Sequence, residues 1–176
     1  MKKSKNIIRL IIFVISLSLL LFLSEFFNIE QEPEVLVKNL SIEQRDGIFF
    51  KNIVYRYPAE VNVIKLLDES KINIGVSSDT DKFNFGRLVF NVTPASSKFL
   101  SIPNNDKRAA KINIKSYGNI SPFITVDKNN IIVEPGTKGE ITVKLNASRL
   151  GRYVGEVDIF IKLPKYDFLV PLIYVS

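Results

Sequence analysis

A nearly continuous stretch of apolar residues opens the chain and ends close to position 27. Between Ile7 and Phe27, 16 positions carry Leu, Ile, Phe or Val. A helix rises about 1.5 Å per residue, so roughly 20 residues match the 30 Å hydrocarbon layer of a bilayer. Arg9 and Glu25 lie near the two ends, where charged side chains reach headgroup water at small cost. The pattern predicts one transmembrane helix that contacts the lipid bilayer through Ile7 to Phe27.

After residue 30, apolar and polar positions alternate with a period of two, which is typical of strands with one buried face. The clearest alternating runs cover 72–76, 112–114, 141–145 and 157–163. Shorter apolar runs at 35–37, 48–50, 53–57, 61–67 and 168–175 also predict strands. Gly and Pro turn signals separate the runs, and no stretch after residue 30 has helical periodicity. The expected fold class is all-β, an antiparallel β-sandwich that follows one N-terminal transmembrane helix.

The charges that flank the apolar stretch predict its orientation. Four cations lie before it or at its start, and four glutamates lie at or after its end before the next cation, Lys38. Cytoplasmic flanks are enriched in Lys and Arg. We therefore expect a single-pass protein of the cell membrane with a cytoplasmic N-terminus and an extracytoplasmic C-terminal domain. A cleaved secretory signal is the alternative, but bulky residues at 21–23 fit a cleavage site poorly.

Composition excludes several kinds of chemistry. The 176 residues include no Cys and no His, which excludes disulfides, zinc fingers, haem or iron–sulfur ligation and His-dependent catalytic triads. The formal net charge is +6, and much of that excess lies in the cations at the start of the chain. The mixed charge of the remainder gives no clustered basic face for nucleic acid. We expect no enzyme activity, no cofactor and no nucleic-acid partner.

Several short motifs in the second half of the chain carry a family resemblance. They are Phe83–Gly86, Ser97–Ile102 with Asn104-Asn105, Ala110–Lys115, Phe123–Val126, Ile131–Gly136, Gly139–Leu145 and Gly151–Gly155. Their succession resembles the immunoglobulin-like modules related to PapD and major sperm protein, in particular the abnormal-spindle/Hydin type, over about residues 71–176. The resemblance implies an immunoglobulin-like antiparallel β-sandwich and no particular function. Pro103 departs from the pattern, so the strand there should end or kink early.

The predicted organisation has three parts. Residues 1–29 form a cytoplasmic basic tip and the transmembrane signal-anchor helix. Residues 30–70 form a short stalk and membrane-proximal strands, and residues 71–176 form the immunoglobulin-like β-sandwich. The strands of 30–70 could extend the same sandwich or form a small sheet of their own.

Four N-x-S/T sequons are candidate glycosylation sites. A proline directly follows the sequons of Asn91 and Asn119, which makes those two the weaker candidates. Asn39 and Asn146 are the stronger ones. Unmodified surface asparagines remain the alternative at all four positions.

Two further patterns could indicate a metal site or a catalytic site. The acidic turn 79–81, with 68–69 upstream, lacks the spaced oxygen ligands of a Ca²⁺ loop, so we expect no metal site. Neighbouring Ser-Lys pairs at 70–71 and 97–98 would point to opposite faces of a strand, which argues against a Ser-Lys hydrolase.

The densest aromatic cluster contains Phe49, Phe50, Tyr55 and Tyr57, interleaved with two cations. Core packing accounts for alternate members of a strand. The remaining aromatic residues form a candidate surface for a partner.

These features predict a membrane-anchored, extracytoplasmic binding or structural module of the cell envelope or of a membrane complex, with a protein partner there. Sequons without disulfides would suit an archaeal surface protein. One alternative is an accessory subunit of a surface machine, similar to archaellar stator proteins, which also join one membrane helix to a β-sandwich. A second alternative is a carboxylate-dependent hydrolase.

Overall fold

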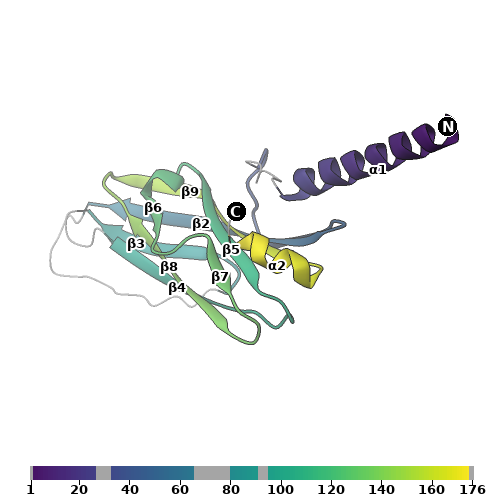
Figure 1. Cartoon of the computed structure of the whole chain (residues 1–176). Coiled ribbons are helices and arrows are strands. Elements are labelled where there is room, and N and C mark those ends of the chain that lie inside the picture. The colour runs from purple at the N-terminus through teal and green to yellow at the C-terminus, as the bar shows by residue number, and fades with distance from the viewer. Residues whose placement is uncertain (1, 27–32, 66–79, 91–94, 175–176) are drawn as a thin grey trace.

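The computed structural model describes residues 2–26, 33–65, 80–90 and 95–174 (Figure 1). These residues form a long N-terminal helix, nine strands and three short helical segments, of which two lie near the C-terminus. The helices are α1 (Lys2–Phe26), η1 (Ser121–Phe123), η2 (Asp167–Leu169) and α2 (Val170–Ile173). The strands are β1 (Ser41–Asp46), β2 (Phe50–Ile64), β3 (Phe83–Val89), β4 (Ala95–Pro103), β5 (Ala110–Gly118), β6 (Ile124–Val126), β7 (Ile131–Val133), β8 (Lys138–Asn146) and β9 (Gly151–Pro164).

The helix α1 extends away from the strands in Figure 1. Its segment Asn6–Phe26 is the one helical stretch among the described residues that is long and apolar enough to cross a membrane. No residue of its apolar window is fully buried, and only the last turn, at Phe22, Glu25 and Phe26, is partly covered by the rest of the chain. The expectation of one N-terminal apolar helix is therefore confirmed.

The strands form two sheets. Sheet A has the order β1-β2-β9-β5-β7, with β3 also paired to β2, and sheet B has the order β4-β8-β6. All pairs are antiparallel except β2–β3. Both sheets contribute to one hydrophobic core, with Val157 and Ile159 from β9 and Val143 and Leu145 from β8. Alternating apolar positions therefore face this core, and the prediction of antiparallel β-structure is confirmed.

The strand β2 joins the N-terminal part of the chain to sheet A. It pairs with β9 along its whole length, and β1 and β3 share its other edge. β1 pairs with residues 51–56 of β2, and β3 pairs with residues 59–64. Pro58 therefore lies at a point on this edge where β2 is paired to neither β1 nor β3. A residue without an N–H removes no ladder hydrogen bond at that point. The run predicted at 53–57 and the part of the run 61–67 up to Ile64 are thus one strand, which lies in the same sheet as β5 and β9, and residues 66–67 lie outside the described residues.

Three runs that the pattern predicts as strands are not strands. Residues 35–37 form a loop, 48–49 form the turn before β2, and 168–173 form η2 and α2. Pro171 lies in the first turn of α2, where its missing N–H is tolerated, whereas in a strand it would interrupt the ladder. The expectation of no helix after residue 30 is corrected by the same segment. The run 72–76 lies outside the described residues, and β4 ends at Pro103 as expected.

Sheet A is covered on both faces near its centre. Five consecutive residues of β9, Gly155–Ile159, are buried, whereas a strand with one wet face alternates. Val157 and Ile159 face the core, so Glu156 and Asp158 point to the opposite side, called here the outer face. The loop at Leu36 and Val37 lies on this outer face, because Val37 N–H donates to Glu156 Oε2 over 2.7 Å.

Candidate membrane-proximal site

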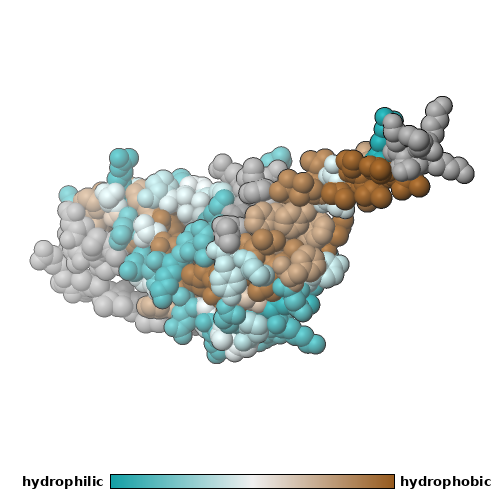
Figure 2. Space-filling view, viewed as in Figure 1, coloured by the Kyte–Doolittle hydropathy of each residue, from teal (hydrophilic) through white to brown (hydrophobic). Residues whose placement is uncertain are grey.

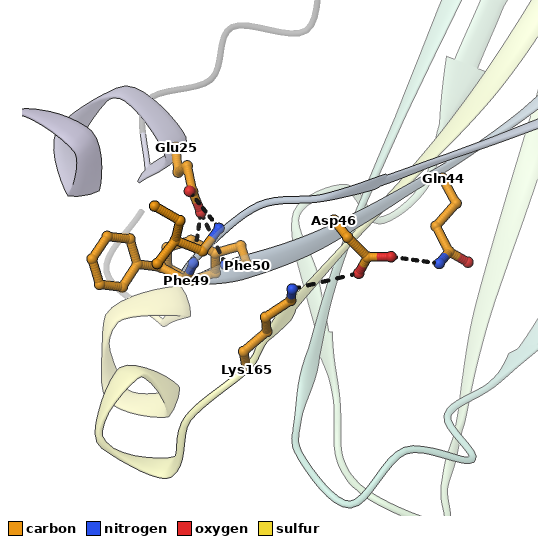
Figure 3. Close-up of polar contacts among 7 residues, drawn as sticks. Glu25, Gln44, Asp46, Phe49, Phe50 and Lys165 are labelled. Atoms are coloured by element: carbon orange, nitrogen blue, oxygen red, sulfur yellow. Dashed lines mark hydrogen bonds and ion pairs between the residues drawn. The ribbon is translucent and has the colours of Figure 1, made fainter.

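The end of α1 is bound to the turn between β1 and β2 through the carboxylate of Glu25 (Figure 3). The backbone N–H groups of Ile48, Phe49 and Phe50 donate to its two oxygens over 2.6, 2.8 and 3.1 Å. Such a row of turn amides is an anion-binding concavity. The carboxylate thus receives three charge-assisted hydrogen bonds where the helix meets the sheet.

Gly47 makes room for this contact. Its N–H donates to Phe50 O over 2.9 Å, which closes the turn. A Cβ at Gly47 would lie 2.6 Å from Cδ of Glu25, closer than real Cβ contacts allow. The Asp46-Gly47 turn signal in the sequence therefore has a second physical role, because a side chain at Gly47 would displace the Glu25 carboxylate from its present position.

Aromatic rings surround the same contact. Phe22 lies edge-on to Phe49 with ring centroids 5.3 Å apart, and it stacks with Phe26 at 5.5 Å. Phe50 is fully buried and lies 6.1 Å from Phe26. The helix and the sheet therefore share a second, smaller apolar cluster outside the main core. Its other members are Ala109, Ile132, Leu169, Val170, Leu172 and Ile173.

Lys162 of β9 closes the end of α1. Its Nζ donates to Phe26 O over 2.5 Å and lies 5.1 Å from the centroid of the Phe26 ring. It also lies 4.7 Å from the ring of Phe50. A cation is favourable at the carbonyl end of a helix, and α1 has no basic residue in its own last turn. Sheet A supplies the charge that the helix lacks.

A buried pair of acids lies farther along the outer face of sheet A. Glu156 is 0% and Asp158 1% exposed. Arg56 Nε lies 3.6 Å from Asp158 Oδ2, and Arg56 also reaches Glu43 at 3.4 Å. Lys115 of β5 is opposite Asp158 in the strand register. Two acids therefore lie beside one close guanidinium.

The pair holds a proton near neutral pH. Burial raises the pKa of Asp158 to about 7; the charge of Glu156 adds to the rise and that of Arg56 opposes it. Burying two ionised carboxylates side by side would be costly, and retaining a proton on one of them removes most of that cost. The outer face beneath the loop therefore carries a carboxylic acid together with a carboxylate that accepts from Val37.

Leu36 contacts the same region. A Cβ at Gly118 would lie 3.1 Å from Leu36 Cδ1 and 2.7 Å from Gly155 Cα. Gly118 thus leaves room for Leu36, while Gly155, opposite it on β9, leaves room for the backbone of Tyr117 and for Ile120. The loop contacts the sheet through Leu36 and Val37, whereas Val35 is 78% exposed.

The four predicted aromatic residues separate into two environments. Phe49 and Phe50 belong to the cluster at the end of α1. Tyr55 and Tyr57 pack against the main core, and the Tyr57 ring lies edge-on to Phe83 at 5.4 Å. None of the four has an exposed side chain. The structure does not bring them together as one surface.

The sequons lie on loops and strand ends. Asn39 and Asn146 are exposed, and Asn119 is exposed with its Oδ1 accepting from Val154 N–H over 2.6 Å. Asn91 lies outside the described residues, as do most residues of the predicted acidic turn, 68–69 and 79. Within the described residues no group of three or more acids could hold a metal ion.

Little in the sequence indicates the contact of Glu25 with the turn or the burial of Glu156 and Asp158. Glu25 reads as a charge that ends an apolar run, and its partners lie 23 to 25 positions away. Glu156 and Asp158 occupy the polar positions of an alternating strand, which normally face water. The one local signal of close packing in this region is the presence of glycine at positions 118 and 155.

Comparisons with protein-family models, with curated proteins and with solved structures give no match to this chain. Its function is inferred from its own geometry.

We predict that Glu25→Ala loosens the turn without unfolding the sheets. The Ile48, Phe49 and Phe50 amides would exchange with solvent about 10-fold faster, since hydrogen bonds to a charge contribute about 1.5–3 kcal/mol. Hydrogen exchange of the full chain in detergent micelles measures this. Glu34→Ala, at an exposed position, is the control. Unchanged exchange of these amides in Glu25→Ala would contradict the contact.

The stability of the chain should decrease as pH rises from about 4 to about 7. The ordinary pKa of Asp158 is 3.8, so between 3.8 and about 7 the folded chain binds the extra proton. The free energy of unfolding then falls by at most about 1.4 kcal/mol per pH unit. Asp158→Asn, which mimics the protonated acid, should flatten this dependence and be more stable than wild type at pH 8.

Denaturant titrations of the full chain in micelles at several pH values test this prediction. Asp81→Asn, which replaces an exposed acid, is the matched control and should keep the wild-type slope. A wild-type stability that rises over the same pH interval would refute the assignment of the proton to this pair.

Proposed function

We propose that the chain is a single-pass membrane protein that presents a non-catalytic binding or structural module outside the cytoplasm, in the cell envelope or in a membrane complex. The observation that carries this proposal is the exposed apolar surface of Asn6–Phe26 on a helix whose last turn is bonded to the sheets. Apolar surface of this extent is stable only when lipid or protein covers it. A bilayer covers it on all sides at once.

The orientation is proposed from the charges at the two ends of α1. Three lysines precede the apolar segment, whereas Glu25 lies at its end and Glu30, Glu32 and Glu34 follow it before the next cation, Lys38. The bias of Lys and Arg toward cytoplasmic flanks supports a cytoplasmic N-terminus. The sheets would then lie on the extracytoplasmic side.

The proposed fold family is the immunoglobulin-like β-sandwich. Immunoglobulin domains place strand E between B and D in one sheet and strand F between C and G in the other. Here β8 lies between β4 and β6, and β9 lies between β5 and β2. The strand in the G position is β2, which precedes the others in the chain. The module would therefore begin at β2 and include a strand outside the 71–176 resemblance.

A non-catalytic role is supported by the burial of the acids Glu156 and Asp158. The one close acid pair seen in the described part of the chain, Glu156 and Asp158, is covered by the loop at Val37 and is closed to a substrate. The sequence offers no Cys or His as nucleophile or base. The exposed Asn39 and Asn146 are compatible with glycosylation of an extracytoplasmic domain.

The topology can be measured with single cysteines, because the natural chain has none. We expect Ser148→Cys, in an exposed loop, to react with a membrane-impermeant maleimide added to intact cells. Ser4→Cys should react only after the membrane is permeabilised. The cysteine-free wild type is the control for background labelling. The reverse pattern would place the sheets in the cytoplasm and contradict the proposal.

A further inference from the structure

We propose that the C-terminal segment Tyr166–Tyr174 and the β1–β2 turn form a lipid-contacting platform that lies in the headgroup region of the bilayer crossed by α1. The platform is defined by the exposed side chains of Ile48, Tyr166, Phe168 and Tyr174. Its occupant is a lipid surface. This inference rests on the proposed membrane anchoring and extends it from the helix to the folded domain.

The depth of the platform follows from the length of α1. The apolar segment has 21 residues, or about 32 Å at 1.5 Å each, which fills a hydrocarbon layer of about 30 Å up to its last residue. Phe22 lies four residues before that end, about 6 Å deeper along the helix. Yet the ring of Phe22 contacts the rings of Phe49 and Phe50 at 5.3 and 6.2 Å. The helix cannot be fully immersed unless this end of the domain also reaches the interface.

The C-terminal segment is held against the same cluster. Leu169 and Ile173 are each 1% exposed and pack with Phe50, while Phe22 and Phe26 pack against the cluster from α1. Arg108 Nε donates to Asp167 Oδ1 over 2.7 Å at the start of η2. The inner side of the segment is therefore fixed by apolar contacts.

The outer side of the segment is apolar and aromatic. Phe168 is 70%, Tyr174 54%, Ile48 53% and Tyr166 46% exposed. The rings of Tyr166 and Phe168 stack at 5.6 Å. Figure 2 shows the hydrophobic surface of α1 continuing onto the domain beside α2. Tyr, which has an apolar ring and a polar hydroxyl, is enriched at membrane–water interfaces, and Phe occurs on the apolar face of segments that lie in the interface.

Charges of both signs surround the platform: Asp167 is 92% exposed and pairs with Arg108, the Tyr174 hydroxyl donates to Glu134, and cations lie beside the aromatic rings. Lys165 follows β9 directly, keeps a third of its side chain exposed and pairs loosely with Asp46 at 3.7 Å. Lys162 is held between the Phe26 and Phe50 rings. Cations immediately beside an aromatic interface attract anionic headgroups. A bilayer matches both the apolar side chains and the adjacent cations. The length of α1 also places the surface of that bilayer level with the platform.

Tryptophan fluorescence tests the platform, because the chain contains no Trp. Phe168→Trp places a reporter on the platform. Phe99→Trp places a matched reporter on β4, where the native ring is 83% exposed. Each full chain is reconstituted into phosphatidylcholine/phosphatidylglycerol vesicles, with or without lipids brominated near the headgroup end of the acyl chains. Tyr166→Trp is a second platform reporter that does not depend on the folding of Phe168→Trp.

We expect brominated lipids to quench the platform reporters about twofold or more relative to Phe99→Trp, with emission shifted to shorter wavelength. Equal quenching at the two sites, in chains that float with the vesicles, would overturn the platform and leave the anchoring intact. A blue shift that depends on protein density and not on bromination would assign the surface to a second copy instead. Chains that fail to float would overturn the anchoring and, with it, the platform.

Discussion

One carboxylate joins the apolar helix to the folded domain. Glu25 lies at the end of α1, where a charge next to hydrocarbon would be costly if it were unpaired. The three turn amides of residues 48–50 satisfy it, and Lys162 does the same for the last carbonyl of the helix. The phenylalanines of both partners fill the space around these bonds. The domain is thereby docked on its helix, and in the proposed bilayer the depth of α1 would set the height of the docked end of the domain.

This docking determines how sheet A is used. One face packs against sheet B, as in any two-layer β-protein. The outer face is occupied near the helix by α2 and its apolar neighbours, and farther along by the loop at Leu36 and Val37. An acid pair buried on that face would be unfavourable if both members were ionised, and the high pKa of Asp158 resolves this with a shared proton. Leu36 and Val37, in the described part of the segment before β1, are thus part of the packed structure.

Local pattern was sufficient for the elements that dominate the fold. A 21-residue apolar run has few alternatives, and long alternating runs such as 141–145 can bury only one face. Short apolar runs were ambiguous, because a run of three to eight apolar residues fits a strand, a turn over a cluster or a short helix equally well. Residues 35–37 and 168–173 became a loop and helices because they cover the outer face of sheet A. The contact of Glu25 with residues 48–50 depends on tertiary structure and leaves no local signal.

The most direct test of the account is the distance between the helix and the domain in a bilayer. Spin labels on Ser18→Cys in α1 and Ser101→Cys in β4, in an otherwise cysteine-free chain, report that distance by pulsed electron resonance in lipid nanodiscs. A docked domain predicts one narrow distance distribution that broadens when Glu25→Ala is added. A broad distribution in the wild-type background would mean that the helix is only a tether, and the account of the docked domain would be wrong.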